Sequence, residues 1–274
     1  MMRVIETELS TAERAALLAG EPAENVIAEL AAMRAAAPDR PEVLIVHSVD
    51  DVSDDAIRDL GRAVSSGVGS FLVQDSAGSL DRDVIERAVS GPARFSETAA
   101  AAPMHTDGMH MPDQPTPGYF SLTCLNSARR GGALSFVHID DVLDGFTEPD
   151  HAVRTLREPF YFHTKGVDPH GREWVVHPVL DDRRDGGHHV RYAREYIDMG
   201  HALSDAPDLA ATAVSVLDEL DDILSRGDLH RRARLRRGDV AVIDNEQVLH
   251  SRTAFENAAG DPPRCLMRLW LQRP

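Results

Sequence analysis

Cysteine is scarce in this sequence, with Cys124 and Cys265 as the only two among 274 residues. Both lie inside apolar stretches typical of strands, so we expect reduced core thiols rather than a disulfide framework. No run of about 18 apolar residues is present, and the start MMRVIETELS lacks the basic-then-apolar order of a signal peptide. These absences predict a soluble, cytoplasmic protein.

Positive charge is also in short supply, because 29 lysines and arginines face 45 acidic residues, for a formal net charge of -16. Such a charge repels phosphate backbones and anionic lipids, so nucleic acid and membranes are poor partners. A glycine-rich phosphate loop and regular strand-helix alternation are absent as well. A nucleotide-binding fold is therefore disfavoured and a small-molecule partner is expected, while the oligomeric state stays open.

Helix-forming sequence dominates the first part of the chain. Ser10 and Glu13 form a capping-box pattern, ENVIAELAAMRAAA is rich in strong helix formers, and Ser53 can cap a further helix. Much later, PDLAATAVSVLDELDDILS carries apolar residues at three- and four-residue spacing, which predicts an amphipathic helix packed on a sheet.

Short runs rich in branched and aromatic residues dominate the rest. They are VGSFLVQ, YFSLTCL, ALSFVHI, FYFHT, EWVVHPVL, HHVRYA, DVAVID and RCLMRLWLQ. Helices followed by many non-repeating strands predict an α+β, mainly β, fold around a double-layered β structure. We expect one domain over residues 1–274, with a helical N-terminal part at 1–66 and a β core with loop and helix insertions at 67–274.

The segment MHTDGMH, residues 104–110, is the best candidate for metal binding. In an extended segment His105 and Asp107 point to the same side, with Cα atoms roughly 6 to 7 Å apart, so both can bind one ion. His250, in DVAVIDNEQVLHSRTAF, is the best third ligand. Two imidazoles and one carboxylate are typical of non-haem Fe(II) oxygenases, although zinc hydrolases also use them. The other histidines near these motifs are interpreted as solvated loop residues: His110, His188 and His189.

The last predicted strand places two arginines on one face. Alternation gives one face with Arg264, Leu266, Arg268 and Trp270 and a second, apolar face with Cys265, Met267, Leu269 and Leu271. Guanidinium groups in an apolar strand are costly unless anions meet them, and four residues span roughly 13 Å, so two anions fit better than one. Structural ion pairs are the alternative, and Arg191 is interpreted as structural.

With these residues assembled, the chain resembles the TauD/TfdA-like Fe(II)/2-oxoglutarate-dependent dioxygenases, close to the branch of clavaminate synthase and amino-acid hydroxylases. The resemblance rests on HTD with its proline-bearing loop, GYFSLTCLNSARRGGALSF, GDVAVIDNEQVLHSRTAF and RCLMRLWL. It covers the chain from about Val68 to the end. It implies a double-stranded β-helix, or jelly roll, with flanking helices.

By position, the resemblance makes His105, Asp107 and His250 the Fe(II) ligands. Arg264, fourteen residues after His250, matches the arginine that holds the far carboxylate of 2-oxoglutarate. Arg268 matches a position that binds the acidic group of the substrate in several relatives. Fe(II), with 2-oxoglutarate and O2 as cosubstrates, is therefore expected.

One position departs from the family pattern. The family usually has a threonine or serine that helps to hold 2-oxoglutarate where this chain has Leu134, with Ser135 next to it. Asp107 bears on the reaction type, because related halogenases replace this carboxylate with a small residue and bind chloride. The resemblance therefore implies hydroxylation or desaturation.

The sequence thus predicts a dioxygenase that hydroxylates or desaturates an unactivated C–H bond of a small carboxylate-bearing substrate and releases succinate and CO2. A free or derivatised amino acid of specialised metabolism is the preferred substrate. The alternatives are a sulfonate or aryloxyalkanoate dioxygenase of the same fold, a zinc hydrolase, and a metal-binding jelly roll without redox activity. The loop at 108–118 either closes over the substrate or forms a rigid connection.

Overall fold

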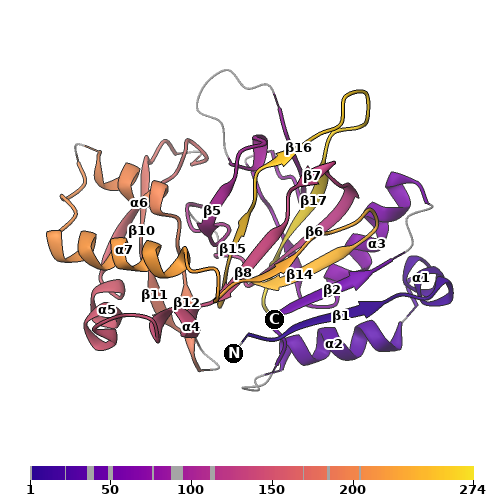
Figure 1. The fold of residues 1–274 in the computed structure, drawn as a ribbon, viewed down its shortest axis with the longest axis horizontal. Coiled ribbons are helices and arrows are strands. Elements are labelled where there is room, and N and C mark those ends of the chain that lie inside the picture. Colours follow the sequence, from indigo (N-terminus) through magenta and orange to yellow (C-terminus); the bar gives the residue numbers. More distant parts are fainter. Residues whose placement is uncertain are drawn as a thin grey trace.

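Two β-sheets lie between two groups of helices (Figure 1). The structure is a computed structural model, and no helix in the part of the chain it describes is long and apolar enough to cross a membrane. The described residues are 2–21, 23–35, 40–48, 52–75, 77–87, 95–111, 115–168, 170–183, 186–203 and 205–274.

The larger sheet has seven strands: β1 (Val4–Glu8), β2 (Val43–His47), β3 (Ser70–Leu72), β4 (Asp81–Ile85), β6 (Tyr119–Asn126), β14 (Val240–Asp244) and β17 (Cys265–Gln272). Their order is β1-β2-β14-β6-β17-β3, with β4 also paired to β17. Only the β1–β2 pair of this sheet is parallel among the described strands. One face packs against three helices: α1 (Thr11–Leu18), α2 (Glu24–Arg34) and α3 (Asp54–Ser66).

The smaller sheet has four strands: β5 (Ala102–His105), β8 (Leu134–His138), β13 (Arg231–Ala233) and β15 (Val248–Arg252). Its order is β13-β8-β15-β5, and every pair is antiparallel. Phe120 and Leu266 of the larger sheet share one buried cluster with Phe136 and Val248 of the smaller sheet. An apolar core therefore joins the two sheets.

The outer face of the smaller sheet carries the second helical group. It contains α4 (Ile139–Leu143), α5 (Pro149–Leu156), α6 (Arg194–His201) and α7 (Ala211–Leu224), with two hairpins, β9 (Pro159–His163) with β10 (Trp174–Pro178) and β11 (Leu180–Asp182) with β12 (His188–Val190). Val137 and Leu249 of the sheet pack with Leu217 and Leu220 of α7. A 3-10 helix (Phe95–Glu97) and a small strand pair, β7 (Arg130–Gly131) with β16 (Phe255–Glu256), complete the set.

Several sequence predictions for single elements are confirmed. The capping box of Ser10 and Glu13 is present at α1, and Ser53 caps α3. In β17, Leu266 and Trp270 face the core between the sheets, whereas the apolar second face packs toward the helices. Cys124 and Cys265 are buried free thiols, as expected.

The prediction of a helical part at residues 1–66 was incomplete. The helices α1 to α3 are there, but β1 and β2 also lie in this segment and extend the larger sheet. Val43, Leu44, Ile45 and Val46 are all buried, because β2 lies between the helices and the core that joins the sheets. A strand buried on both faces lacks the alternation that marks a half-exposed strand, and it is easily overlooked.

Candidate active site

The pairing of β5 with β15 brings two histidines together. His105 ends β5 and lies opposite His250 in the antiparallel register, with ring centroids 4.2 Å apart. Asp107 follows two residues after His105, and its Oδ1 is 3.8 Å from His105 Nε2. One ligand atom from each of these three residues lies within 4.8 Å of the others. The structure therefore brings together the three side chains that the sequence nominated as ligands.

Burial and charge prepare these groups for a metal ion. Burial would raise the pKa of Asp107, but Arg268 and the two imidazoles lower it to about 2. Burial, assisted by His105, lowers the pKa of His250 to about 3. The carboxylate is thus ionised and the His250 imidazole neutral at physiological pH, which is the state that metal binding requires.

The hydrogen bonds of the imidazoles fit the same ion. His105 Nδ1 is 2.9 Å from the carbonyl oxygen of Pro103, so this nitrogen donates and Nε2 keeps its lone pair for the centre. His250 is 6% exposed, and its Nδ1 is buried without a hydrogen-bond partner. A buried imidazole nitrogen without a hydrogen-bond partner destabilises the fold unless the ring gains a compensating interaction, such as a bond to a metal ion. This donor set fits a divalent cation with one open face.

The backbone of the ligand loop is held rigidly. The Asp107 N–H donates to Asn245 Oδ1 at 2.8 Å, and Asn245 Nδ2 donates to the Asp107 carbonyl at 3.0 Å. Gly108 follows with φ +79°, and a Cβ there would lie 2.3 Å from Pro117 Cδ. Only glycine adopts this conformation in this space without strain. The loop therefore presents Asp107 in one fixed orientation.

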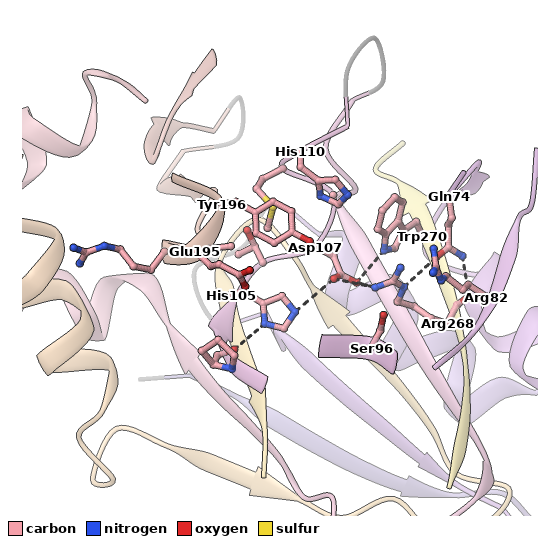
Figure 2. Close-up of a pocket in the computed structure, with 16 residues that line it drawn as sticks. Gln74, Arg82, Ser96, His105, Asp107, His110, Glu195, Tyr196, Arg268 and Trp270 are labelled. Carbon is pink, nitrogen blue, oxygen red and sulfur yellow. Dashed lines mark hydrogen bonds and ion pairs between the residues drawn. The ribbon is translucent and has the colours of Figure 1, made fainter. Parts of the chain in front are cut away.

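The carboxylate of Asp107 accepts hydrogen bonds from β17. Trp270 Nε1 donates to Oδ2 at 2.9 Å, and Arg268 Nη1 lies 3.2 Å from each oxygen (Figure 2). Arg268 also stacks over the Trp270 ring, 4.7 Å from its centroid, and its Nε donates to Gln74 Oε1. Arg268, predicted to bind the substrate, thus lies beside the candidate metal ligand.

An inner cavity opens between the sheets beside the three candidate ligands. Besides those ligands, its lining combines apolar residues such as Phe120 and Leu134 with five polar ones, Ser96, Ser251, Arg252, Arg264 and Arg268. Arg264 is 4% exposed, its Nη1 has no hydrogen-bond partner, and it has no acidic partner among the described residues. Burial and the nearby Arg252 lower the pKa of Arg264 to about 10. A cation buried at this cost requires an anion in the cavity.

Leu134 occupies the wall where the family usually has a hydroxyl group. It lies in the core between the sheets and lines the inner cavity. Alternation along β8 turns Ser135 to the opposite face, so the register does not slip to bring a hydroxyl into the cavity. Position 134 therefore contributes an apolar side chain and no hydroxyl group to the cavity.

A second cavity, here called the outer cavity, shares His105, Asp107 and Arg268 with the inner one. Figure 2 shows Arg82 and Arg268 on one side of it, and Glu195 and Tyr196 on the other. Each cation has a carboxylate neighbour: Arg82 contacts Glu97 at 3.0 Å, and Arg268 contacts Asp107. The Glu195 carboxylate is 2.6 Å from Lys165 Nζ. The cavity therefore has two paired arginines, Arg82 and Arg268, on one side and the paired carboxylate of Glu195 on the other.

Two of the histidines interpreted as solvated loop residues are partly buried. His110 lines the outer cavity and packs against Tyr196, with ring centroids 5.0 Å apart. Burial and the adjacent Arg191 lower the pKa of His189 to about 3. Arg191 lines a separate cavity and lies 3.3 Å from Thr116 Oγ1, in line with a structural role.

Sequence reasoning missed three residues around Asp107: Gln74, Asn245 and Trp270. Alternation placed Trp270 on the correct face but suggested no partner for its N–H group. Asn245 lies in the polar turn ahead of His250, and Gln74 ends a strand-like run. Their positions in the sequence carry a signal, but their roles depend on contacts between distant segments.

Comparison with known proteins assigns the family. Residues 15–270 match the model of the taurine catabolism dioxygenase TauD, TfdA family. The chain belongs to this family. The resemblance inferred from the sequence motifs is thereby confirmed.

Two curated proteins are similar to this chain in sequence. FR-33289 synthase of Streptomyces rubellomurinus is 27% identical over 187 residues, 65% of this chain and 51% of that protein. Dioxygenase str8 of Strobilurus tenacellus is 24% identical over 181 residues, 64% of this chain and 40% of that protein. The chain thus spans about half the length of these relatives or less.

Solved structures show the same fold. An asparagine oxygenase in complex with Fe(II), 2S,3S-3-hydroxyasparagine and succinate has a TM-score of 0.74 at 17% identity, over 97% of this chain and 93% of that one. The non-haem iron oxygenase OrfP, in complex with Fe and alpha-ketoglutaric acid, has a TM-score of 0.72 at 17% identity, over 98% and 94%. The TauD, TfdA chain described here therefore shares its fold with iron oxygenases.

Proposed function

We propose that this chain is an Fe(II)- and 2-oxoglutarate-dependent dioxygenase. It hydroxylates or desaturates an unactivated C–H bond of a small carboxylate-bearing substrate and releases succinate and CO2. The proposal rests mainly on the placement of His105, Asp107 and His250 beside a cavity that contains the guanidinium of Arg264. This guanidinium is buried and has no acidic partner in the part of the chain that the structure describes. Family membership and the iron-bound structural relatives support the proposal.

Each group at the centre has a task. His105, Asp107 and His250 would hold Fe(II), and bound Fe(II) supplies the dioxygen activation that no side chain here provides. Arg264 binds the far carboxylate of 2-oxoglutarate through a charge-assisted contact at the end of the inner cavity. Apolar side chains such as Phe120 line part of the cavity and help to exclude water from the reacting groups.

The outer cavity suits a zwitterion, so a free or derivatised amino acid is the proposed substrate class. Arg268 and Arg82 offer positive charge to a substrate carboxylate, and Glu195 offers negative charge to an ammonium group on the other side (Figure 2). FR-33289 synthase, asparagine oxygenase and OrfP are relatives whose names and ligands support this class and a place in specialised metabolism.

The proposal includes the finer architecture. The two sheets and their shared core form the jelly roll of the family, and residues 1–274 act as one dioxygenase domain. Two free, buried cysteines support action inside the cell, in the cytoplasm.

A substrate screen tests the function. Purified protein with Fe(II), 2-oxoglutarate and O2 is offered amino acids, other carboxylates and sulfonates, and succinate is measured. We expect stimulated succinate with amino acids and a product that gains one oxygen or loses two hydrogens by mass spectrometry, with none from Asp107→Ala. Stimulation by sulfonates alone would favour the sulfonate alternative. A native chain that binds Fe(II) but never forms succinate would contradict the proposal.

A further inference from the structure

The two oxygens of Asp107 have different surroundings. Oδ1 lies 3.8 Å from Nε2 of His105, another of the three candidate ligands. Oδ2 accepts the indole N–H of Trp270 at 2.9 Å. We propose that Trp270 is a positioning residue that holds Oδ2 and leaves Oδ1 as the single Asp107 ligand to the metal. This inference rests on the proposed function.

Trp270 suits the task because its ring is fixed. It is 3% exposed, and its strand pairs with a neighbour on each side, opposite Phe120 and Leu72. The guanidinium of Arg268 covers the ring at 4.7 Å from its centroid. Because the ring is packed on both sides, the position and direction of its N–H group are fixed.

Arg268 and Trp270 bind the same carboxylate in different ways. Arg268 Nη1 lies 3.2 Å from both oxygens, so it does not distinguish them. The indole contacts Oδ2 alone and carries no formal charge, so it orients the carboxylate without opposing a nearby cation. The choice of oxygen therefore depends on Trp270.

The number of open metal positions depends on this choice. Two imidazoles and a carboxylate bound through one oxygen leave open positions for a chelating keto acid and for dioxygen. A carboxylate bound through both oxygens would take one of them. By holding Oδ2, Trp270 keeps that position open.

Cobalt binding tests the inference without any turnover. Co(II) is titrated anaerobically into the native chain, Trp270→Phe and Trp174→Phe, with visible absorption as the readout. Trp270 and Trp174 are the two tryptophans of the chain, and Trp174 donates to Asp205 at 3.2 Å, away from the centre. Phenylalanine keeps one aromatic ring and removes the N–H donor together with the five-membered ring, a loss that the Trp174→Phe control shares. We expect Co(II) affinity to fall about 10- to 100-fold and the spectrum to change in Trp270→Phe, with Trp174→Phe within twofold of native.

A second measurement uses the native chain, so it does not depend on whether a variant folds. With Zn(II) bound, the indole proton of Trp270 should exchange with solvent far more slowly than that of Trp174 in NMR spectra. Fast exchange at Trp270, or a native-like Co(II) affinity and spectrum in a folded Trp270→Phe, would overturn the inference about Trp270 and leave the proposed function intact. Failure of the native chain to bind Co(II) or Fe(II) would instead overturn the proposed function.

Discussion

At the scale of single residues, the site depends on buried charges that need partners. Arg264 is buried with a depressed pKa and no acidic neighbour among the described residues, and its guanidinium lies over the Phe255 ring at 5.1 Å. Asp107, in contrast, is surrounded by donors. The inner cavity is therefore prepared for an anion at one end and for a cation at the other.

Replacing Arg264 should weaken cosubstrate binding selectively. A hydrogen bond to a charged group is worth about 2 kcal/mol, so Arg264→Met should raise the KM for 2-oxoglutarate about 30-fold or more. 2-Oxoglutarate should raise the melting temperature of the native chain and not that of the variant. The exposed Arg231→Met is the matched control. An unchanged KM in Arg264→Met would place the cosubstrate elsewhere.

Glu195 should discriminate among substrates. If its carboxylate binds the ammonium group of the substrate, Glu195→Gln should lower kcat/KM for amino acids about tenfold. This factor corresponds to a loss of roughly 1.4 kcal/mol in binding free energy. Analogues without the amino group should react equally well with both forms. The exposed Glu158→Gln serves as the control. A uniform loss across both substrate groups would argue against ammonium recognition.

The candidate ligands could be selected from the sequence because their signals are local. His105 and Asp107 share a side of an extended segment, and His250 follows an apolar strand. The partners of these groups could not be selected in this way. Asn245 and Trp270 reach Asp107 across 138 and 163 residues, and only the folded register brings their donors within hydrogen-bond distance.

At the scale of elements, the antiparallel register of β5 and β15 does most of the positioning. It sets His105 opposite His250, and the loop after β5 then turns at Gly108. Alternation in β17 predicted correctly which side chains share a face. The strand β2 escaped prediction because both of its faces are buried.

Gly108→Ala should disturb the metal site through the backbone. The positive φ and the 2.3 Å approach of a Cβ to Pro117 Cδ force the loop to move. We expect a loss of about 1–3 kcal/mol in the free energy of unfolding together with weaker Co(II) binding. Gly166→Ala is the matched control, because Gly166 has φ +72° and no atom within 4 Å of an added Cβ. Equal Co(II) affinity in the two variants would contradict the claim that the Gly108 loop holds Asp107 in a fixed orientation.

At the scale of the whole molecule, one buried carboxylate joins distant parts of the chain. Asp244, at the end of β14, is 2.5 Å from Arg40, 3.2 Å from Arg183 and 2.9 Å from Arg273. These arginines come from the N-terminal part, the β11–β12 connection and the C-terminus. The layered arrangement could be predicted from the order of elements, but this cluster could not, because nothing in the local sequence pairs its members.

Asp244 predicts a pH dependence of stability. Burial would raise its pKa, but the three arginines lower it to about 2. Because the folded pKa lies below the unfolded value of about 4, its contribution is complete above pH 4 and disappears as the pH falls toward 2. Urea unfolding at pH 7 should show that Asp244→Asn lowers the free energy of unfolding by about 3 kcal/mol. The exposed Asp198→Asn is the control.

The difference in the free energy of unfolding between the native chain and Asp244→Asn should become smaller when the measurement is repeated below pH 4. A difference that is constant from pH 7 to pH 3 would mean that the Asp244 carboxylate is not the source of the effect.

The most direct test of the central claim is the absorption spectrum of the protein with Fe(II) and 2-oxoglutarate under anaerobic conditions. A keto acid chelated to iron beside His105, Asp107 and His250 should give a weak visible charge-transfer band, absent without 2-oxoglutarate and lost in His250→Ala. A native chain that binds Fe(II) yet shows no band, or a band that persists in His250→Ala, would contradict the claim.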